Sequence, residues 1–463
     1  MRKQTCWLFT ALVLSVAAAI TAQGISAQEY TSRMEVLQNE ALRRDFTIQG
    51  VYLAGTGTDK AGLHMIANGD GTFRVVFYHG GLPGDGWKAG DRRVLGTAKV
   101  DGDKITFNIT DVHGTSPEGM ENPRGETEGK ITIETPQRGQ GQGAGQFRGT
   151  PVKIEVMNAT YERQTTRSPT FNQAAPDGAV VIFDGTNLDK FQPGAKMNEA
   201  PQRPGAGSVQ QRPGAGNTLW AEAATTAFEK KPYKMHIEFM LSYMPQARGQ
   251  GRSNSGVYID ERYELQVLDS FGLEGENNEC GGFYTIAKPL INMCFPPLTW
   301  QTYDIEFTPA QYDGNQKTVN ARVTVVHNGV KIHDNIELQG TPGRKDEGPE
   351  PLGLYLQGHG NKVQYRNIWL QYQDEPWLQY QDEPAAQAES VAETPEPTVA
   401  AERPRRRAAS GITIQQPSNP DVPQVVTVVV APDAQSTTEE SGDVSQQQTA
   451  PRRLLQRLRP SIR

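Results

Sequence analysis

The chain has 463 residues, of which 36% are hydrophobic and 21% are charged, and this length leads us to expect two compact units with additional tails. The formal net charge of −7 argues against a dedicated nucleic-acid-binding protein, which would usually carry a basic face. Beyond the N-terminal segment, no apolar run reaches the roughly 20 residues that a membrane-spanning helix needs, which excludes a polytopic membrane protein.

The N-terminal segment has the composition of an export signal. Basic residues at positions 2 and 3 precede an apolar stretch over residues 7–20, and the small residues Ala22 and Ala27 suit a cleavage site. We therefore predict a signal peptide over residues 1–27 and a secreted or periplasmic protein. An uncleaved N-terminal anchor is the alternative interpretation.

Two cysteines, Cys280 and Cys294, remain after removal of this segment. Exported proteins usually fold in an oxidising compartment, so we predict a disulfide between these cysteines that closes a short loop. Two free buried thiols are the alternative.

Residues 33–44 carry a short helical stripe of apolar side chains, after which the apolar period changes to two. This alternation is typical of half-buried strands, and the sequence NGDG at 68–71 predicts a hairpin turn between two of them. Residues 45–165 are therefore predicted to form a small antiparallel β domain. The predicted strands cover residues 51–53, 63–67, 73–78, 104–109, 130–133 and 152–161.

A second β-rich unit is predicted over residues 176–372. No helical stripe of ten residues separates its strands, which favours two packed antiparallel sheets over alternating strands and helices. The predicted strands cover residues 179–183, 234–241, 256–259, 263–268, 302–307, 321–327, 352–356 and 363–370.

The C-terminal segment, residues 385–463, is rich in Ala, Gln, Glu, Pro and Thr and poor in aromatic residues, so we predict that it is disordered. It contains two basic clusters, at residues 403–407 and 452–463. These clusters are expected either to contact an anionic surface or to remain solvated.

The clearest candidate for a functional site lies on the predicted strand 263–268. Alternation places Leu265 and Val267 toward the core, so Glu264 and Gln266 are expected side by side on an open polar face of the sheet. A glutamate in such a position is often merely solvated.

Two further stretches add polar candidates. Gln357 and His359 follow the strand that ends at Leu356, and Tyr284 lies in the loop between the two cysteines. No zinc-ligand spacing, nucleophile elbow, P-loop or dinucleotide fingerprint occurs, so we expect neither covalent serine chemistry nor a nucleotide cofactor.

Taken together and in order, the motifs of the second unit resemble the 3-keto-disaccharide hydrolase domain family. The segments that carry the resemblance are FDG at 183–185, NSGVY at 254–258, YELQVLD at 263–269, WQTYDI at 300–305, HNG at 327–329, LQGHG at 356–360 and YRNI at 365–368. The resemblance implies a concanavalin-like jelly-roll sandwich whose concave sheet carries the site. The predicted protein is thus all-β, with a smaller β domain before the sandwich and a disordered tail after it.

The resemblance also implies a reaction. The family's substrates are glycosides whose carbon 3 is a ketone, which acidifies the hydrogen on carbon 2. Removal of this proton by a base expels the glycosidic oxygen from carbon 1, and water then adds to the enone. Such a site needs a base, a cationic or metal group for the enolate oxygen, and an acid for the leaving group.

On this resemblance, Glu264 and His359 are the candidates for the base, in either assignment. Arg366 is the third catalytic candidate, and either Arg366 or Arg252 is expected to hold the enolate. The residues expected to contact the substrate are Arg252, Asn254, Tyr258, Gln266, Asp269, Tyr284 and Gln357. Asp269 is alternatively a ligand of a divalent ion, and the presence of a metal is left open.

Two other functions remain possible at this point. A carbohydrate-binding module without turnover would use the same sandwich, with Tyr258, Tyr284 and Trp300 as stacking platforms. A glucanase acting on unmodified glycans is less favoured, because no E-x-D-x-x-E run occurs on a predicted strand.

Overall fold

The computed structural model describes residues 27–134, 150–199, 216–340 and 344–373. The predicted C-terminal tail, residues 385–463, lies outside these residues. Residues 1–26 of the predicted signal peptide also lie outside them. Within the described residues, no helix combines the length and apolarity that crossing a bilayer requires.

Two short helices precede the first strand, α2 (Arg33–Gln38) and α3 (Glu40–Ile48). Ser32 starts α2 with a capping box, and the side chain of Asn39 accepts a backbone N–H at the start of α3. The helix expected over residues 33–44 is therefore divided at Asn39, because this residue ends one helix and caps the next.

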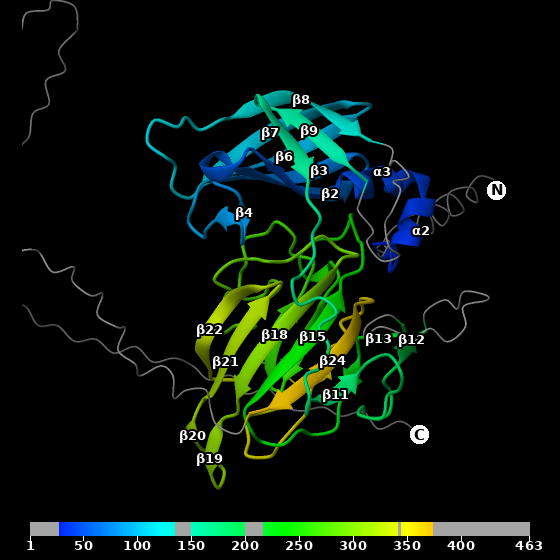
Figure 1. Ribbon diagram of the computed structural model, residues 1–463, viewed down its shortest axis with the longest axis vertical. Helices are drawn as coiled ribbons and strands as arrows, with labels where there is room; N and C mark the ends of the chain where they lie inside the picture. The colour runs from blue at the N-terminus through cyan, green and yellow to red at the C-terminus, as the bar shows by residue number, and fades with distance from the viewer. Residues whose placement is uncertain (1–26, 135–149, 200–215, 341–343, 374–463) are drawn as a thin grey trace, which may run out of the picture. The chain divides into compact units, whose positions relative to one another are not determined.

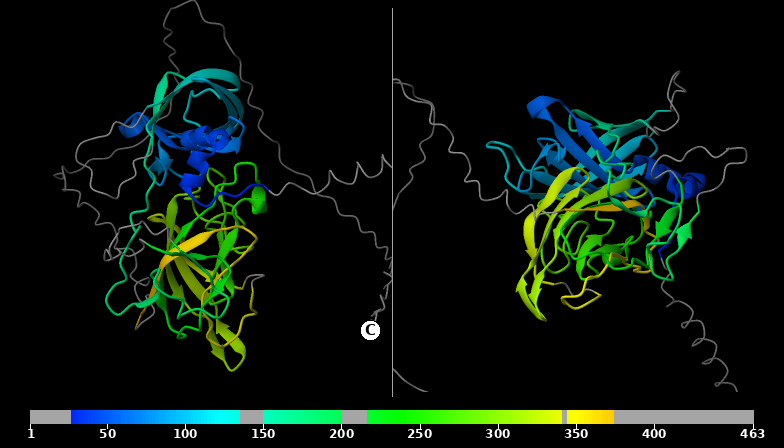
Figure 2. Two further views of the ribbon diagram at one scale, coloured as in Figure 1. Left: turned by 90° about the vertical axis from the view of Figure 1, so that its right-hand side faces the viewer. Right: turned by 60° about the horizontal axis from the view of Figure 1, so that its bottom comes forward.

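Eight antiparallel strands then close into a barrel in the order β1-β10-β9-β8-β7-β6-β3-β2 (Figures 1 and 2). Inward-facing side chains fill its interior, where Tyr52, Phe73 and Phe107 are fully buried. The barrel strands are β1 (Gly50–Ala54), β2 (Ala61–Gly69), β3 (Thr72–His79), β6 (Arg93–Asp101), β7 (Lys104–His113), β8 (Gly125–Ile133), β9 (Val152–Val156) and β10 (Ala159–Arg163). The short strands β4 (Leu82–Pro83) and β5 (Gly86–Trp87) pair beside them.

Two further antiparallel sheets form a sandwich. The larger sheet has the order β12-β13-β24-β15-β18-β21-β22, with β11 also paired to β24 (Figure 1). Its strands are β11 (Val180–Phe183), β12 (Met197–Asn198), β13 (Thr218–Trp220), β15 (Tyr233–Met240), β18 (Trp300–Thr308), β21 (Ala321–His327), β22 (Val330–Leu338) and β24 (Gln364–Tyr372).

The smaller sheet has the order β14-β23-β16-β17. Its strands are β14 (Ala223–Ala224), β16 (Ser255–Ile259), β17 (Tyr263–Val267) and β23 (Tyr355–Leu356). A separate hairpin consists of β19 (Gln311–Asp313) and β20 (Gln316–Val319).

Two tyrosines of the larger sheet reach across the core to the smaller sheet. The Tyr303 hydroxyl donates to the Gln266 carbonyl (2.8 Å), and the hydroxyls of Tyr365 and Ser255 are 2.7 Å apart. The layers therefore face each other over one buried interior, and the prediction of an all-β protein is confirmed.

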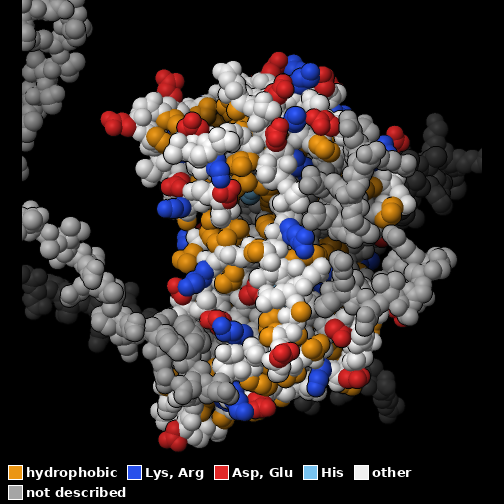
Figure 3. Space-filling view, viewed as in Figure 1, with side chains coloured by type: hydrophobic (Ala, Val, Ile, Leu, Met, Phe, Trp, Pro, Cys, Tyr) orange, Lys and Arg blue, Asp and Glu red, His pale blue; other side chains and the backbone are white. Residues whose placement is uncertain are grey.

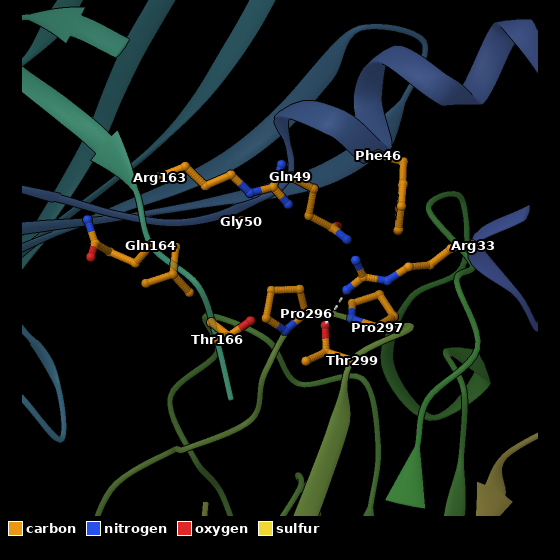
Figure 4. Close-up of a pocket in the computed structure, with 11 residues that line it drawn as sticks. Arg33, Phe46, Gln49, Gly50, Arg163, Gln164, Thr166, Pro296, Pro297 and Thr299 are labelled. Atoms are coloured by element: carbon orange, nitrogen blue, oxygen red, sulfur yellow. Dashed lines mark hydrogen bonds between the residues drawn. The ribbon is translucent and has the colours of Figure 1, made fainter. Parts of the chain in front are cut away.

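The barrel and the sandwich share buried surface. Ile66 and Val76 of the barrel belong to the same hydrophobic cluster as the sandwich core. Phe271 stacks on His64 with ring centroids 4.6 Å apart, and its carbonyl accepts a hydrogen bond from Arg74 (3.1 Å). A small hollow of about 30 Å³ also opens between them (Figure 4), lined by residues that include Arg33, Phe46, Arg163, Pro296 and Thr299.

The surface carries charges of both signs. On the face shown in Figure 3, acidic and basic side chains are interspersed with apolar ones. This distribution agrees with the modest net charge of −7 for a chain of this length.

Candidate functional site

The strand β17 turns alternate side chains to opposite faces, as predicted. Leu265 and Val267 belong to the core, whereas Glu264 and Gln266 point to the outer face of the smaller sheet. This face is more enclosed than expected, since Glu264 is only 6% exposed and Gln266 only 2%.

A loop contributes to this enclosure by pairing with β17. The backbone N–H of Gln266 donates to the Gly282 carbonyl (2.8 Å), and the N–H of Tyr284 donates to the Glu264 carbonyl (3.1 Å). Tyr284 is thereby held beside the two polar side chains.

Glu264 lies at the end of a chain of hydrogen bonds between neighbouring strands. Tyr258 is the register partner of Glu264 on β16 and also pairs with Tyr355 on β23. The Gln357 side-chain amide donates to the Tyr258 hydroxyl (3.0 Å), and this hydroxyl is hydrogen-bonded to Glu264. Burial raises the pKa of Glu264, and the hydrogen bond from Tyr258 only partly offsets this effect.

The side chain of Gln250 orients two side-chain amides near Glu264, those of Asn254 and Gln266. The side-chain nitrogens of Asn254 and Gln266 both donate to Oε1 of Gln250, each at 3.1 Å. Their own side-chain oxygens, and that of Gln357, are buried without a hydrogen-bond partner among the described residues. Because unsatisfied buried acceptors destabilise a fold, such oxygens suit a ligand that brings hydroxyl donors.

These side chains define one site on the outer face of the smaller sheet, here called the polar cluster. Its members are Asn254, Tyr258, Glu264, Gln266 and Gln357.

A glycine leaves the space that the polar cluster needs. Gly256 pairs with Gln266 on the neighbouring strand. A Cβ atom at position 256 would lie 2.7 Å from Oε1 of Glu264 and 3.0 Å from the Tyr258 ring. The Glu264 carboxylate therefore occupies space that the side chain of any other residue at position 256 would fill.

Arg252 and Asp269, both predicted to contact the substrate, bind each other instead. Nε of Arg252 lies 2.6 Å from Oδ2 of Asp269, and both side chains are buried. Arg252 also donates to the carbonyl of Ala67 in the barrel (3.4 Å). Their contacts are thus at the junction of barrel and sandwich.

Arg366 lies on the other side of the sandwich from Glu264. Its neighbour Tyr365 points into the core, so Arg366 faces outward from the larger sheet. There it pairs with Glu238 (Nε to Oε2, 2.8 Å) and stacks on Trp300 at 4.1 Å. The structure does not bring Arg366 and Glu264 together.

His359 is exposed in the loop that follows β23. It stands two positions after Gln357 of the polar cluster. The structure places it near the end of the smaller sheet, outside the hydrogen-bonded chain that ends at Glu264.

Two residues of the site were missed by sequence reasoning. Gly256 stands inside the NSGVY motif, and the available signal was a glycine within a predicted strand, which often marks a close approach of another group. Gln250 precedes that motif in a short 3-10 turn, Gly249–Gly251, and nothing in its sequence context points to a role.

The predicted disulfide is not formed, which corrects that prediction. Cys280 and Cys294 are buried free thiols, the alternative noted above. The thiol of Cys280 lies 3.2 Å from the Tyr303 hydroxyl, and burial raises the pKa of the Cys294 thiol. Both cysteines therefore lie in the sandwich core as free thiols. Among the described residues, no three His, Cys, Asp or Glu side chains converge as metal ligands.

Comparison with known proteins bears on the same region. Residues 178–371 match the family model of the 3-keto-alpha-glucoside-1,2-lyase-like domain, which confirms the resemblance drawn from the motifs and supports a carbohydrate-active protein. No curated protein matches the chain.

Two solved structures from Parabacteroides distasonis ATCC 8503 are similar to the chain, each described as a "putative glycosyl hydrolase". The first, at 2.13 Å resolution, is 25% identical with a TM-score of 0.34 and covers 43% of this chain and 86% of its own. The second, at 1.70 Å, is 18% identical with a TM-score of 0.28 and covers 43% and 95%.

Proposed function

We propose that this chain is an exported enzyme that cleaves 3-keto-glycosides by elimination, with Glu264 as the base. The observation that carries the proposal is a buried carboxyl group with a raised pKa, beside amide oxygens that lack partners. A base is most effective when its pKa lies near the working pH, and the environment of Glu264 shifts its pKa in that direction.

The reaction needs one proton transfer to begin. The Glu264 carboxylate removes the proton from carbon 2 of the keto-sugar, and the electron pair forms the enolate with the carbon 3 ketone. The carbon 1–oxygen bond then breaks, and the leaving oxygen takes up a proton. Addition of water to the resulting enone gives the free 3-keto-sugar.

The remaining members of the polar cluster would bind the sugar. The unpaired oxygens of Asn254, Gln266 and Gln357 accept hydrogen bonds from hydroxyls, and the Tyr258 hydroxyl keeps Glu264 in place. Neither predicted arginine borders Glu264, so in this proposal neutral hydrogen-bond donors stabilise the enolate oxygen.

A carbohydrate-binding module without turnover is the second candidate. It is favoured by the same unpaired acceptors and by Tyr258 and Tyr284, which lie beside Glu264. In that function, Glu264 would be only a ligand contact.

The substitution Glu264→Gln separates the two candidates, because it keeps the shape of the side chain and removes the base. We expect kcat to fall about 10²- to 10⁴-fold while sugar affinity stays nearly unchanged. The measurement is release of 3-keto-glucose together with calorimetric sugar titration. Glu306→Gln, on the larger sheet, is the control. A wild-type protein that binds glycans without turnover would establish the binding module.

A further inference from the structure

Gln250 lies in the short 3-10 turn just before β16 and is half-buried. Its side-chain nitrogen donates to the Asn278 carbonyl at 2.7 Å, in the loop that follows β17. A carbonyl oxygen can only accept a hydrogen bond, so this contact fixes which end of the Gln250 amide is the nitrogen. The other end, Oε1 of Gln250, therefore faces the polar cluster.

Because Oε1 is an acceptor, it determines the orientation of the two amides that contact it. The side-chain nitrogens of Asn254 and Gln266 each lie 3.1 Å from this oxygen and donate to it. If either amide were turned round, two oxygens would face each other without a hydrogen between them. The side-chain oxygens of both amides are thus directed away from Gln250.

The two amides use their N–H groups within the protein. Asn254 also donates to the backbone carbonyl of Gln250 (2.9 Å), and Gln266 also donates to the Asn278 carbonyl (3.4 Å). The side-chain oxygens of both, in contrast, are buried without a hydrogen-bond partner among the residues that the structure describes. This part of the site has acceptors to offer, and it suits a ligand that brings hydroxyl donors.

The two amides depend on the Gln250 side chain to different degrees. Asn254 keeps the backbone carbonyl of residue 250 as an acceptor whichever side chain stands there. The other acceptor of Gln266 lies at 3.4 Å, beyond the usual length of an N–H···O hydrogen bond. Gln266 also stands two positions from Glu264 on the same strand and face, so its orientation affects the site next to the base.

We propose that Gln250 is a positioning residue, which holds the side-chain oxygen of Gln266 so that it accepts a hydrogen bond from one hydroxyl of the sugar. This inference rests on the proposed function, since it takes the polar cluster as the substrate site. It goes further in two ways. It gives a role to a residue outside the motifs that carry the resemblance, and it requires one particular hydroxyl of the substrate for tight binding.

The test compares steady-state kinetics on methyl 3-keto-glucoside. Gln250→Met keeps the length of the side chain and removes its polar atoms, so the Gln266 amide is free to rotate. We expect KM to rise roughly tenfold with kcat nearly unchanged, because a hydrogen bond made equally in the ground state and the transition state is lost. Gln250→Glu keeps an acceptor for the two amides and should restore most of the affinity. Gln311→Met, at an exposed position of the separate hairpin, is the matched control.

A double-mutant cycle shows whether Gln250 acts through Gln266. In a Gln266→Met background, Gln250→Met should change KM by less than about twofold, because the oxygen that it positions is already absent. An undiminished effect in that background would overturn the assignment. A Gln250→Met protein with the KM of the wild type would overturn it as well, even if its unfolding midpoint were lowered.

Deoxy substrates identify the hydroxyl that Gln266 binds. Methyl 3-keto-glucoside carries hydroxyl groups at carbons 2, 4 and 6 only. We therefore expect Gln250→Met to leave KM unchanged for one of the three corresponding deoxy compounds and to raise it for the other two. An equal rise for all three would contradict the proposed hydrogen bond.

A binding measurement separates failure of this inference from failure of the proposed function. If the wild-type protein converts no 3-keto-glucoside, the enzyme proposal fails, and unoxidised methyl glucoside is titrated calorimetrically into the same variants. Weaker binding by Gln250→Met, restored in Gln250→Glu, would support the positioning role at a binding site. Equal affinities of wild type and Gln250→Met would contradict it.

Discussion

Burial of the Glu264 carboxyl group destabilises the folded state. It is only 6% exposed and forms no ion pair with a described residue, so burial raises its pKa. A carboxyl group whose pKa is raised on folding lowers stability as the pH rises from its unfolded pKa to its folded pKa. A carboxyl group that the fold keeps despite this loss of stability is a candidate for a functional site.

Gly256→Ala tests the crowding around this carboxylate. The new Cβ would lie 2.7 Å from Oε1 of Glu264, so we expect the carboxylate to be displaced. The close atom is the end of a flexible side chain, and the fold should persist. Thermal unfolding should therefore change little, whereas turnover should fall at least about tenfold because the base is misplaced.

The matched control is Gly251→Ala. A Cβ atom at position 251 would meet no atom within 4 Å, and the residue lies in the turn just before the same strand. This variant should keep wild-type activity. Equal activities of the two variants would contradict the role given to the space at Gly256.

At the scale of elements, the chain between barrel and sandwich binds the outer face of the larger sheet. We call residues 168–173 the strap. The Ser168 hydroxyl lies 2.6 Å from that of Thr302, and the Thr170 hydroxyl donates to Asp304 (2.7 Å). The backbone N–H of Asn172 donates to Glu238. The strap therefore rests on the carboxylates of the sheet.

A buried histidine organises these carboxylates. Nδ1 of His236 lies 2.6 Å from Asp304, its Nε2 lies 3.5 Å from Glu238, and its ring stacks on Trp369. Burial lowers the pKa of His236, but the two carboxylates outweigh burial and the net pKa is raised. Glu238 is also paired with Arg366.

The raised pKa predicts a pH-dependent stability. The contribution of His236 is fully present below its unfolded pKa of about 6.5 and is lost as the pH rises through its folded pKa. The midpoint of thermal unfolding should accordingly fall over this window in the wild-type protein, and His236→Asn should abolish that fall.

His327→Asn is the control for this measurement. Burial lowers the pKa of His327 to about 3, so this residue is neutral over the whole window. Above the unfolded pKa of about 6.5, His327 is neutral in the folded and the unfolded state alike, so its replacement should lower the unfolding midpoint by the same amount throughout this window. If the unfolding midpoints of the wild-type protein and of His236→Asn changed with pH in parallel, the assignment of a charged His236 would be wrong.

Local pattern was sufficient to predict the direction of the site residues but not their partners. The period of two in β17 placed Glu264 and Gln266 on one outer face, because alternation is a property of the strand itself. Their burial depends on a loop that pairs with β17, and alternation carries no information about it. The position of Arg366 depends on which of the two sheets contains β24. Long-range strand pairing determines this, and the motif YRNI carries no information about it.

At the scale of the whole molecule, the barrel and the sandwich bury surface against each other. The strand β2 is buried along nearly its whole length, and Ile66 contributes to the sandwich core while Met65 contributes to the barrel core. Within residues 63–67 every position except His64 is apolar, and apolar residues at consecutive positions of a strand indicate burial on both faces. The sequence thus contained a sign of this junction, although it could not identify the partner surface.

The junction also explains two residues that the resemblance had given to the substrate. The Arg252–Asp269 pair connects the end of the smaller sheet with the barrel through the Ala67 carbonyl. Motif positions at the end of a strand can therefore serve the assembly of two β units.

The most direct measurement is to incubate the protein with matched pairs of substrates, 3-keto-glucosides and the same glucosides unoxidised, with and without a chelator. The account predicts release of 3-keto-glucose from the oxidised member of each pair only, and loss of that release in Glu264→Gln. Cleavage of the unoxidised sugars, or undiminished release by Glu264→Gln, would contradict it.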